Sequence, residues 1–175
     1  EANSVVVVTE LKKLLSAQGM TLVESAAPRT VDIAPAAKNL IGKVDVIYTN
    51  TDNNVVSAYE SLVKVANEAK IPLVAGDTDS VKRGAIAALG INYYDLGKQT
   101  GAVVARILKG EKPGAIASAG STDLELFVNE GAAKKQGATL SADLLKDAKA
   151  LSKKPDAKDA KELSKSLAKL EKLLS

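Results

Sequence analysis

The sequence predicts an α/β protein, an open parallel sheet flanked by helices, followed by a C-terminal amphipathic helix. Apolar runs typical of strands alternate with segments of helical periodicity along most of the chain. The order strand, helix, strand, helix is typical of right-handed βαβ units, whose strands are parallel. After residue 152 the composition narrows to little more than Ala, Asp, Glu, Lys, Leu and Ser. We therefore divide the chain into an α/β domain at 1–152 and an added helix at 153–175.

The first expected element is a helix over residues 4–18. Ser4 is placed to cap this helix and Gly19 to end it. The four consecutive valines at 5–8 fit a strand equally well, because β-branched residues favour strands. The leucines that follow have helical spacing, and on that ground we predict a helix.

The other elements of the domain follow from the same two patterns. Strands are predicted near Thr21, Val44, Ile71, Ala85 and Leu124. Helices are predicted over residues 32–41, 53–69, 94–109, 131–136 and 141–151. In the 94–109 helix the apolar side chains expected to point inward are Leu96, Val103, Val104, Ile107 and Leu108.

The tail carries four leucines at spacings of four, three and four, namely Leu163, Leu167, Leu170 and Leu174. They would form one apolar face of a helix, expected over residues 156–174. A natural amphipathic tail and an engineered helix both fit this pattern. The narrow set of strong helix formers favours the engineered helix. We expect it to dock on the apolar face of the 94–109 helix or on a second copy of the chain.

Composition argues against several function classes. The net charge is +3, from 24 basic and 21 acidic residues spread along the chain, which does not indicate nucleic-acid binding. The absence of Cys and His removes disulfides, thiolate catalysis, the usual zinc sites and the commonest general base near neutral pH. No apolar run of about 18 residues is present. The chain begins Glu-Ala-Asn-Ser, without Met or a signal-peptide pattern, so we expect a processed or excised piece.

Two polar turns indicate where a ligand would bind. Thr51-Asp52-Asn53 follows the strand near Val44, and Asp77-Thr78-Asp79-Ser80 follows the strand near Ile71. Ligands of open parallel sheets bind at the carboxyl ends of the strands, where both turns would lie. The turns carry carboxylates and hydroxyls instead of a glycine-rich phosphate loop. They therefore favour a small polar or zwitterionic ligand over a nucleotide.

Structural roles compete with this interpretation. Ser4, Asn53 and Ser80 would each serve as an ordinary helix cap. Asp77 and Asp79 would fit acid–base catalysis or a hard cation. Without His or Cys, however, Ser–Lys is the remaining nucleophile–base pair. We therefore expect no catalytic residues, no metal site and no cofactor.

Six segments together resemble a known family. They are residues 1–4 (EANS), 44–53 (VDVIYTNTDN), 71–87 (IPLVAGDTDSVKRGAIA), 90–101 (GINYYDLGKQTG), 107–113 (ILKGEKP) and 124–129 (LELFVN). In this order they resemble the C-terminal lobe of the TrpX-like ABC-transporter substrate-binding proteins, which have a type I periplasmic binding protein fold. The resemblance covers the chain to about residue 151 and does not extend to the tail.

The resemblance implies a two-lobed parent with its ligand in the cleft between the lobes. The partner lobe and the strand expected immediately before Glu1 would be absent here. The C-lobe half of the ligand site would be Asn3, Ser4, Thr51, Asp52, Asn53, Asp77 and Thr78. An amino-acid-like ligand fits these residues. Backbone N–H groups and the hydroxyl near Ser4 would hold its carboxylate, and Asp52 or Asp77 its ammonium.

The leading hypothesis is thus a fragment or engineered derivative of a solute-binding protein, not an enzyme. The parent family is periplasmic and docks on an ABC permease, whereas an engineered derivative would be a recombinant soluble protein. One alternative is a designed scaffold with no ligand. Another is a subunit that needs a partner chain to complete the cleft. We also expect that two copies of the chain can form a homodimer through their exposed apolar faces.

Deleting residues 153–175 is expected to cause aggregation or a large drop in melting temperature. Burying four Leu side chains contributes roughly 6–12 kcal/mol before the entropy of ordering the helix is subtracted. Thermal unfolding and light scattering of the full and shortened chains test this. A shortened chain that stays monomeric and melts at the same temperature contradicts the docking hypothesis.

Overall fold

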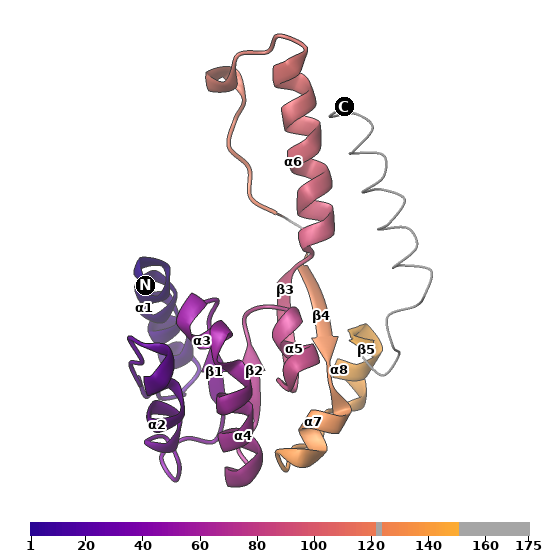
Figure 1. Cartoon of the computed structure of the whole chain (residues 1–175). Helices are drawn as coiled ribbons and strands as arrows, with labels where there is room; N and C mark the ends of the chain where they lie inside the picture. Colours follow the sequence, from indigo (N-terminus) through magenta and orange to yellow (C-terminus); the bar gives the residue numbers. More distant parts are fainter. Residues whose placement is uncertain (122–123, 151–175) are drawn as a thin grey trace.

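The computed structural model describes residues 1–121 and 124–150 (Figure 1). The predicted helix at 153–175 and the domain boundary at 152 lie outside the described residues. The helices are α1 (Ala2–Ala17), α2 (Ile33–Lys38), α3 (Asn53–Ser57), α4 (Tyr59–Ala69), α5 (Asp79–Arg83), α6 (Tyr93–Leu108), α7 (Glu130–Lys135) and α8 (Ala142–Asp147). Two 3₁₀ turns, Thr30–Asp32 and Pro113–Ala115, complete the helical elements of this part of the chain. None of the helices described is long and apolar enough to cross a membrane.

The predicted open sheet is confirmed, although the β3–β4 pairing is antiparallel and the strand predicted near Thr21 is not part of it. Its five strands lie in the order β1 (Ile47–Thr49), β2 (Leu73–Ala75), β3 (Ala87–Ile91), β4 (Leu124–Val128) and β5 (Lys149–Ala150). β1, β2 and β3 are parallel, with Ile47 opposite Leu73 and Ala75 opposite Ala88. β4 runs antiparallel to β3 because α6 carries the chain beyond the sheet and β4 returns toward it (Figure 1).

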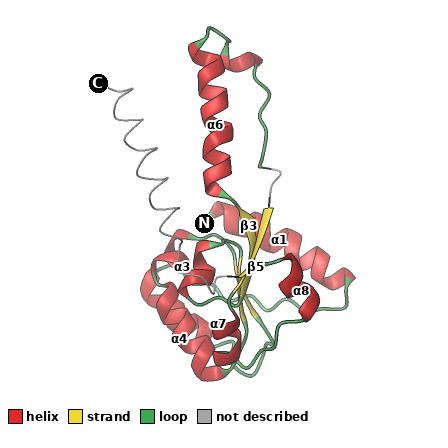
Figure 2. Cartoon of the chain, turned by 90° about the vertical axis from the view of Figure 1, so that its right-hand side faces the viewer, coloured by secondary structure: helices red, strands yellow, loops and turns green. Residues whose placement is uncertain are grey.

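The core lies between the parallel strands and the helices α2, α4 and α5. Its fully buried side chains include Tyr59 on α4, Leu73 on β2 and Val81 on α5. A smaller cluster packs Ile86 against Ala132 and Ala133 of α7. Seen along the edge of the sheet, α3 and α4 cover one face, while α1 and α8 lie on the other (Figure 2). This layered arrangement is the one predicted.

Two predicted elements near the N-terminal end differ from the structure. The first helix has the expected extent, and Gly19 ends it with a φ of +72°. Ser4 lies within this helix instead of capping it. The strand predicted near Thr21 is wrong, because a strand requires a hydrogen-bonded neighbour and residues 21–24 pair with none in the part of the chain described.

The helix predicted over 53–69 is broken at Ala58, where φ is −115° and ψ is 26°. The Arg83 guanidinium donates to the Val56 carbonyl at 2.7 Å, an acceptor that a continuous helix would use for its own ladder. The predicted helix over 141–151 is also too long. It ends at Asp147, and the next residues pair with β4 as β5.

The inward orientation predicted for the apolar side chains of 94–109 is wrong. α6 projects away from the sheet and has no buried residue (Figures 1 and 2). Val104 is 48% exposed and Leu108 82% exposed. The periodicity correctly identified an apolar face, but β3 directs this helix away from the core that the face was expected to join.

Gly84 supplies a stability test of the fold. It has a φ of +128°, and an added Cβ would lie 2.6 Å from Val63 Cγ1. Gly84→Ala should lower the free energy of unfolding by about 2 kcal/mol or more, because the residue would be both strained and crowded. Gly97→Ala is the matched control: a Cβ there meets no atom within 4 Å, and the change should stabilise α6 by about 0.5–1 kcal/mol. Urea unfolding that gives the two variants equal stabilities would contradict this packing.

Candidate functional site

The candidate site lies at the carboxyl ends of β1, β2 and β3, where loops 50–52 and 76–78 begin. The Gly76 N–H donates to the Thr49 carbonyl at 2.8 Å and so ties the two loops together. A Cβ on Gly76 would lie 3.3 Å from that carbonyl, and a Cβ on Gly90 would lie 3.3 Å from the Gly76 carbonyl. Glycine at these two positions lets the ends of three strands approach closely.

The first turn of α1 is fastened to the loop after β1. Asn3 Nδ2 donates to the Thr51 carbonyl at 2.9 Å, and Ser4 Oγ donates to Asp52 Oδ2 at 3.0 Å. Asn53 Nδ2 donates to a carboxylate oxygen of Glu1 at 2.9 Å. Five of the seven residues predicted from sequence are therefore brought together, although they lie about fifty positions apart in the chain.

Asp52 is the cap of α3, so the capping role considered for Asn53 is wrong. Its Oδ1 accepts from the N–H groups of Asn54 at 2.9 Å and Val55 at 3.2 Å. Partial burial acts to raise the pKa of Asp52. Hydrogen bonds from the two N–H groups of α3 and from Ser4 outweigh it and hold this pKa below its ordinary value. The carboxylate therefore stays ionised and holds both α1 and α3.

Asp77 serves α5 in the same way on the neighbouring loop. Its Oδ1 accepts from the Ser80 N–H at 2.9 Å, and its Oδ2 accepts from the Ser80 hydroxyl at 2.7 Å. Thr78 follows it, and its backbone lies against Gly90. Asp77 and Thr78 make no side-chain hydrogen bond to the group around Asp52 within the residues described. Asp79 pairs with Lys82 at 3.0 Å and is exposed.

Tyr59 connects the two loops from below. Its side chain is fully buried, and its hydroxyl lies 3.4 Å from that of Thr49 at the end of β1. Burial raises the pKa of Tyr59 to about 12, although hydrogen bonds to Thr49 and Ser80 act in the opposite direction. Arg83 lies over the same ring at 5.4 Å and donates to both carboxylate oxygens of Glu60, at 2.6 and 2.7 Å. α4 and α5 are thus locked under the site.

Sequence reasoning missed two residues here. Asn50 donates to Ser4 Oγ at 2.7 Å, and the Tyr48 hydroxyl lies 2.9 Å from the position of a Cβ on Gly76. Tyr48 is 44% exposed, and its partial burial raises its pKa. Asn50 directly precedes the first polar turn, and this position in the sequence could have identified it as a residue of the site. Tyr48 alternates with the buried Ile47 and Thr49, which indicates that its side chain faces the other way.

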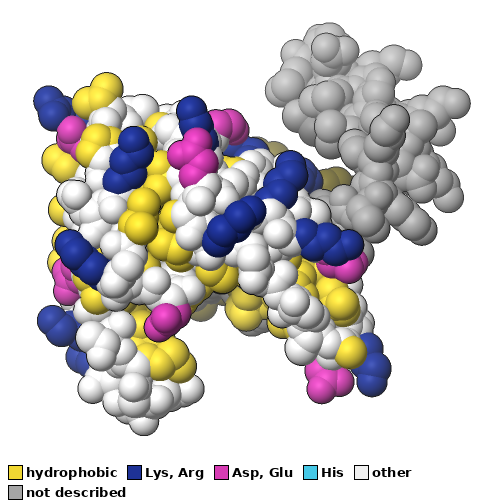
Figure 3. Space-filling model, turned by 90° about the horizontal axis from the view of Figure 1, so that it is seen from below, with side chains coloured by type: hydrophobic (Ala, Val, Ile, Leu, Met, Phe, Trp, Pro, Cys, Tyr) yellow, Lys and Arg dark blue, Asp and Glu magenta, His cyan; other side chains and the backbone are white. Residues whose placement is uncertain are grey.

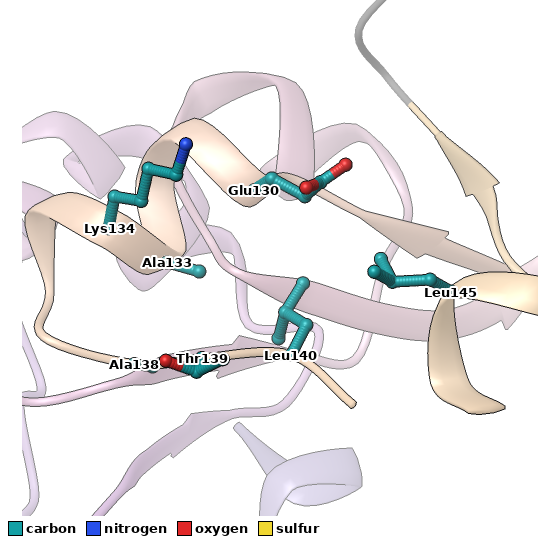
Figure 4. A pocket seen from close by; sticks show the side chains of 7 residues that line it. All are labelled: Glu130, Ala133, Lys134, Ala138, Thr139, Leu140 and Leu145. Atoms are coloured by element: carbon teal, nitrogen blue, oxygen red, sulfur yellow. The ribbon is translucent and has the colours of Figure 1, made fainter. Parts of the chain in front are cut away.

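Two hollows lie away from these loops. One, of about 110 Å³, is bounded by α7 and Leu145 of α8, with Glu130, Lys134 and Leu140 around it (Figure 4). The other, of about 250 Å³, is lined by residues of α4, α5 and α7, among them Asn67, Lys82 and Lys135. Neither contains any of the seven predicted residues. On the lower face of the molecule basic side chains are mixed with acidic and apolar ones, without a single-sign field (Figure 3).

The layered α/β lobe and its polar edge agree with the family comparison. The family of ABC transporter substrate-binding proteins matches residues 1–152. The chain belongs to this family. This family is one of substrate-binding proteins and not of enzymes, which agrees with the prediction made from the sequence.

Individual relatives share between a third and a half of their own length with this chain. The Tyrosine-binding protein of Clostridioides difficile (strain R20291) is 35% identical over 147 residues, which is 83% of this chain and 43% of the relative. An uncharacterized Rickettsia prowazekii protein, RP367, is 32% identical over 98 residues, which is 56% of this chain and 32% of that protein.

Solved structures are also similar to this chain over part of their length. A conserved domain protein of Vibrio cholerae is 39% identical with a TM-score of 0.80, over 86% of this chain and 51% of that one. An ABC domain from Streptococcus pneumoniae, solved in complex with L-Trp, is 30% identical with a TM-score of 0.77, over 86% and 52%. The chain thus corresponds to about half of each of these proteins.

Asp52→Ala tests the electrostatics of the site. Removing this cap should lower the free energy of unfolding by about 0.5–2 kcal/mol at neutral pH. The folded state lowers the pKa of Asp52. The contribution is therefore complete above the unfolded value near 3.8 and is lost as pH falls through the lower folded value. Urea unfolding of both proteins between pH 7 and pH 2 should show their stabilities converging in acid.

Asp79→Asn is the control for this series. Its side chain is 70% exposed and pairs with Lys82 at the surface, so the change should cost less than about 1 kcal/mol. If the difference in unfolding free energy between wild type and Asp52→Ala stays constant down to the lowest pH, the ionised carboxylate is not what stabilises the fold.

Proposed function

We propose that this chain is the C-terminal lobe of a solute-binding protein that captures an amino acid for import through an ABC permease. The observation that carries the proposal is the polar group at the carboxyl edge, which joins Asn3 and Ser4 to the loop at 51–53. The names of two relatives, one tyrosine-binding and one solved with L-Trp, favour an aromatic amino acid. The family supports a site of action outside the cytoplasmic membrane.

The free hydrogen-bonding capacity of the site suits a zwitterion. A carboxylate offers about four acceptor positions. Asp52 has three of them filled, by Asn54, Val55 and Ser4, whereas Asp77 has two filled, both by Ser80. Asp77 is therefore the better acceptor for a ligand ammonium. The hydroxyls of Thr51 and Thr78 make no hydrogen bond within the described chain and can donate to a ligand carboxylate.

A second lobe would supply the remaining contacts. The chain spans about half the length of its relatives, and α6 extends from the lobe with its apolar face exposed. Residues 1–152 would then act as one wall of a cleft that closes on the ligand. Two arrangements would supply the other wall of the cleft. One is a partner chain that carries the other lobe, and the other is a second copy of this chain that packs through such apolar faces. We also propose that the chain is a fragment or an engineered derivative of such a solute-binding protein.

A scaffold without a ligand is the competing function. The observation that favours it is that both carboxylates already hold helix ends, so the loops need no ligand to be ordered. The two functions make opposite predictions for binding once the missing wall is supplied.

Isothermal titration with L-Tyr, L-Trp and a panel of other amino acids tests the proposal. The chain alone should bind at millimolar dissociation constants or more weakly, because association costs several kcal/mol and half of the contacts are missing. Adding the N-terminal half of the Clostridioides difficile relative should raise the affinity for an aromatic amino acid. Asp77→Ala should abolish the gain, and Asp79→Asn should preserve it.

Two results would count against this account. Micromolar binding by the chain alone, lost on Asp77→Ala, would show that one wall is a complete site. No binding of any amino acid with the second wall present would favour the scaffold.

A further inference from the structure

Asn50 stands at the end of β1 and was absent from the residues predicted to bind a ligand. Its amide donates to Ser4 Oγ at 2.7 Å, and Ser4 Oγ in turn donates to Asp52 Oδ2 at 3.0 Å. Both hydrogen bonds are partly buried and join residues 46 and 48 positions apart. The three side chains form a relay with one direction, from the amide through the hydroxyl to the carboxylate.

The direction of the relay follows from hydrogen-bonding capacity. Asn50 donates through its NH₂ group, so Ser4 Oγ must accept there. An ionised Asp52 only accepts, so the single hydroxyl hydrogen of Ser4 must point to it. While the relay is intact, Ser4 cannot donate to a ligand carboxylate. The hydroxyls left for that role are those of Thr51 and Thr78.

The position of α1 depends on such polar contacts. α1 has sixteen residues and none of them is buried. Its apolar side chains Val5, Val6 and Leu14 are all more than 60% exposed. Four other apolar side chains of this helix are half-buried, namely Val7, Val8, Leu11 and Leu15. The hydrogen bonds of the first turn add to this partial anchoring, and the side-chain bonds between α1 and the β1–α3 loop come from Asn3 and Ser4. Asn50 supports one of these two.

We infer that Asn50 is a positioning residue of the solute site, acting through Ser4 to hold the first turn of α1 against the loop that carries Thr51 and Asp52. The inference rests on the proposed function for its effect on solute binding. The relay itself rests on the three side chains and the two distances. The role assigned to Asn50 is to orient Ser4, not to touch the solute.

A double-mutant cycle of Asn50→Ala and Ser4→Ala tests the inference, with two measurements. The first is an NMR titration of the Asp52 carboxyl in the chain itself. Each single variant should raise the pKa of Asp52, because each weakens a hydrogen bond to the ionised form. The second is the affinity for L-Trp or L-Tyr in the presence of the second lobe, which each single variant should weaken by roughly fivefold to tenfold.

The coupling between the two changes is the decisive quantity. Adding Asn50→Ala to Ser4→Ala should change neither the Asp52 pKa nor the affinity further, because Asn50 acts through the hydroxyl that is already gone. Asn54→Ala is the matched control. Its side chain donates to the Pro28 carbonyl at 3.0 Å, outside the relay, and its backbone N–H still caps α3. This variant should leave the Asp52 pKa at the wild-type value.

The hydrogen-bond relay and the role of Asn50 in solute binding can be disproved separately. An Asp52 pKa unchanged by Asn50→Ala, or an equal effect of Asn50→Ala with and without Ser4, would overturn the relay. If wild type binds no amino acid with the second lobe present, the proposed function fails and with it the role of Asn50 in solute binding. The NMR titration still decides whether the relay exists.

Discussion

The burial of Tyr59 beneath the carboxyl edge is the constraint on which the site depends. Tyr59 is completely enclosed, its hydroxyl reaches Thr49 at the end of β1, and Arg83 lies over its ring. A buried hydroxyl without a partner would be costly, so its bond to Thr49 fixes the depth at which α4 packs on the sheet. Arg83 then draws α5 toward α4 through Glu60. The loops that begin on β1 and β2 are spaced by this single side chain and the groups around it.

Above Tyr59, two aspartates organise the loops in parallel ways. Asp52 caps α3, and Asp77 accepts from the Ser80 N–H in the first turn of α5; each lies in the turn after a parallel strand. Because the strands are parallel and adjacent, both caps lie on one edge of the sheet. A carboxylate that accepts hydrogen bonds from the start of a helix is already ordered before any ligand arrives. The same residues therefore explain local folding and a preformed polar surface, and the two roles do not compete.

The sequence allowed the parallel strands and the polar edge to be predicted because both follow from local patterns. The run near Ile71 is continuous and apolar, whereas the run near Val44 is interrupted by Asp45 and forms a strand with one exposed face. What was missed depends on contacts between distant residues. At the break near Ala58 the Val56 carbonyl accepts from Arg83, a residue 27 positions away from Val56. The segment near Thr21 is extended in pattern, but no local rule reveals whether a strand will lie beside it.

The same limit applies to the candidate site. The recruitment of Asn50 is decided by the placement of α1 over the β1 loop. That placement is a tertiary contact between residues almost fifty positions apart. Helical periodicity identified an apolar face on α6 correctly and assigned it to the wrong surroundings. Periodicity reports which side chains share a face, but it does not report what covers that face.

The contrast between the polar edge and the bare apolar faces is the strongest physical argument for half of a cleft. α1 and α6 border the edge and expose Val5, Leu14, Val104 and Leu108. A protein that bound its ligand on this lobe alone would gain nothing from such exposure, which usually marks an interaction surface. A second lobe lying on these faces would bury the apolar area and enclose the ligand in one step. Water would then be excluded from Asp77 and the threonine hydroxyls, and their hydrogen bonds to a zwitterion would strengthen.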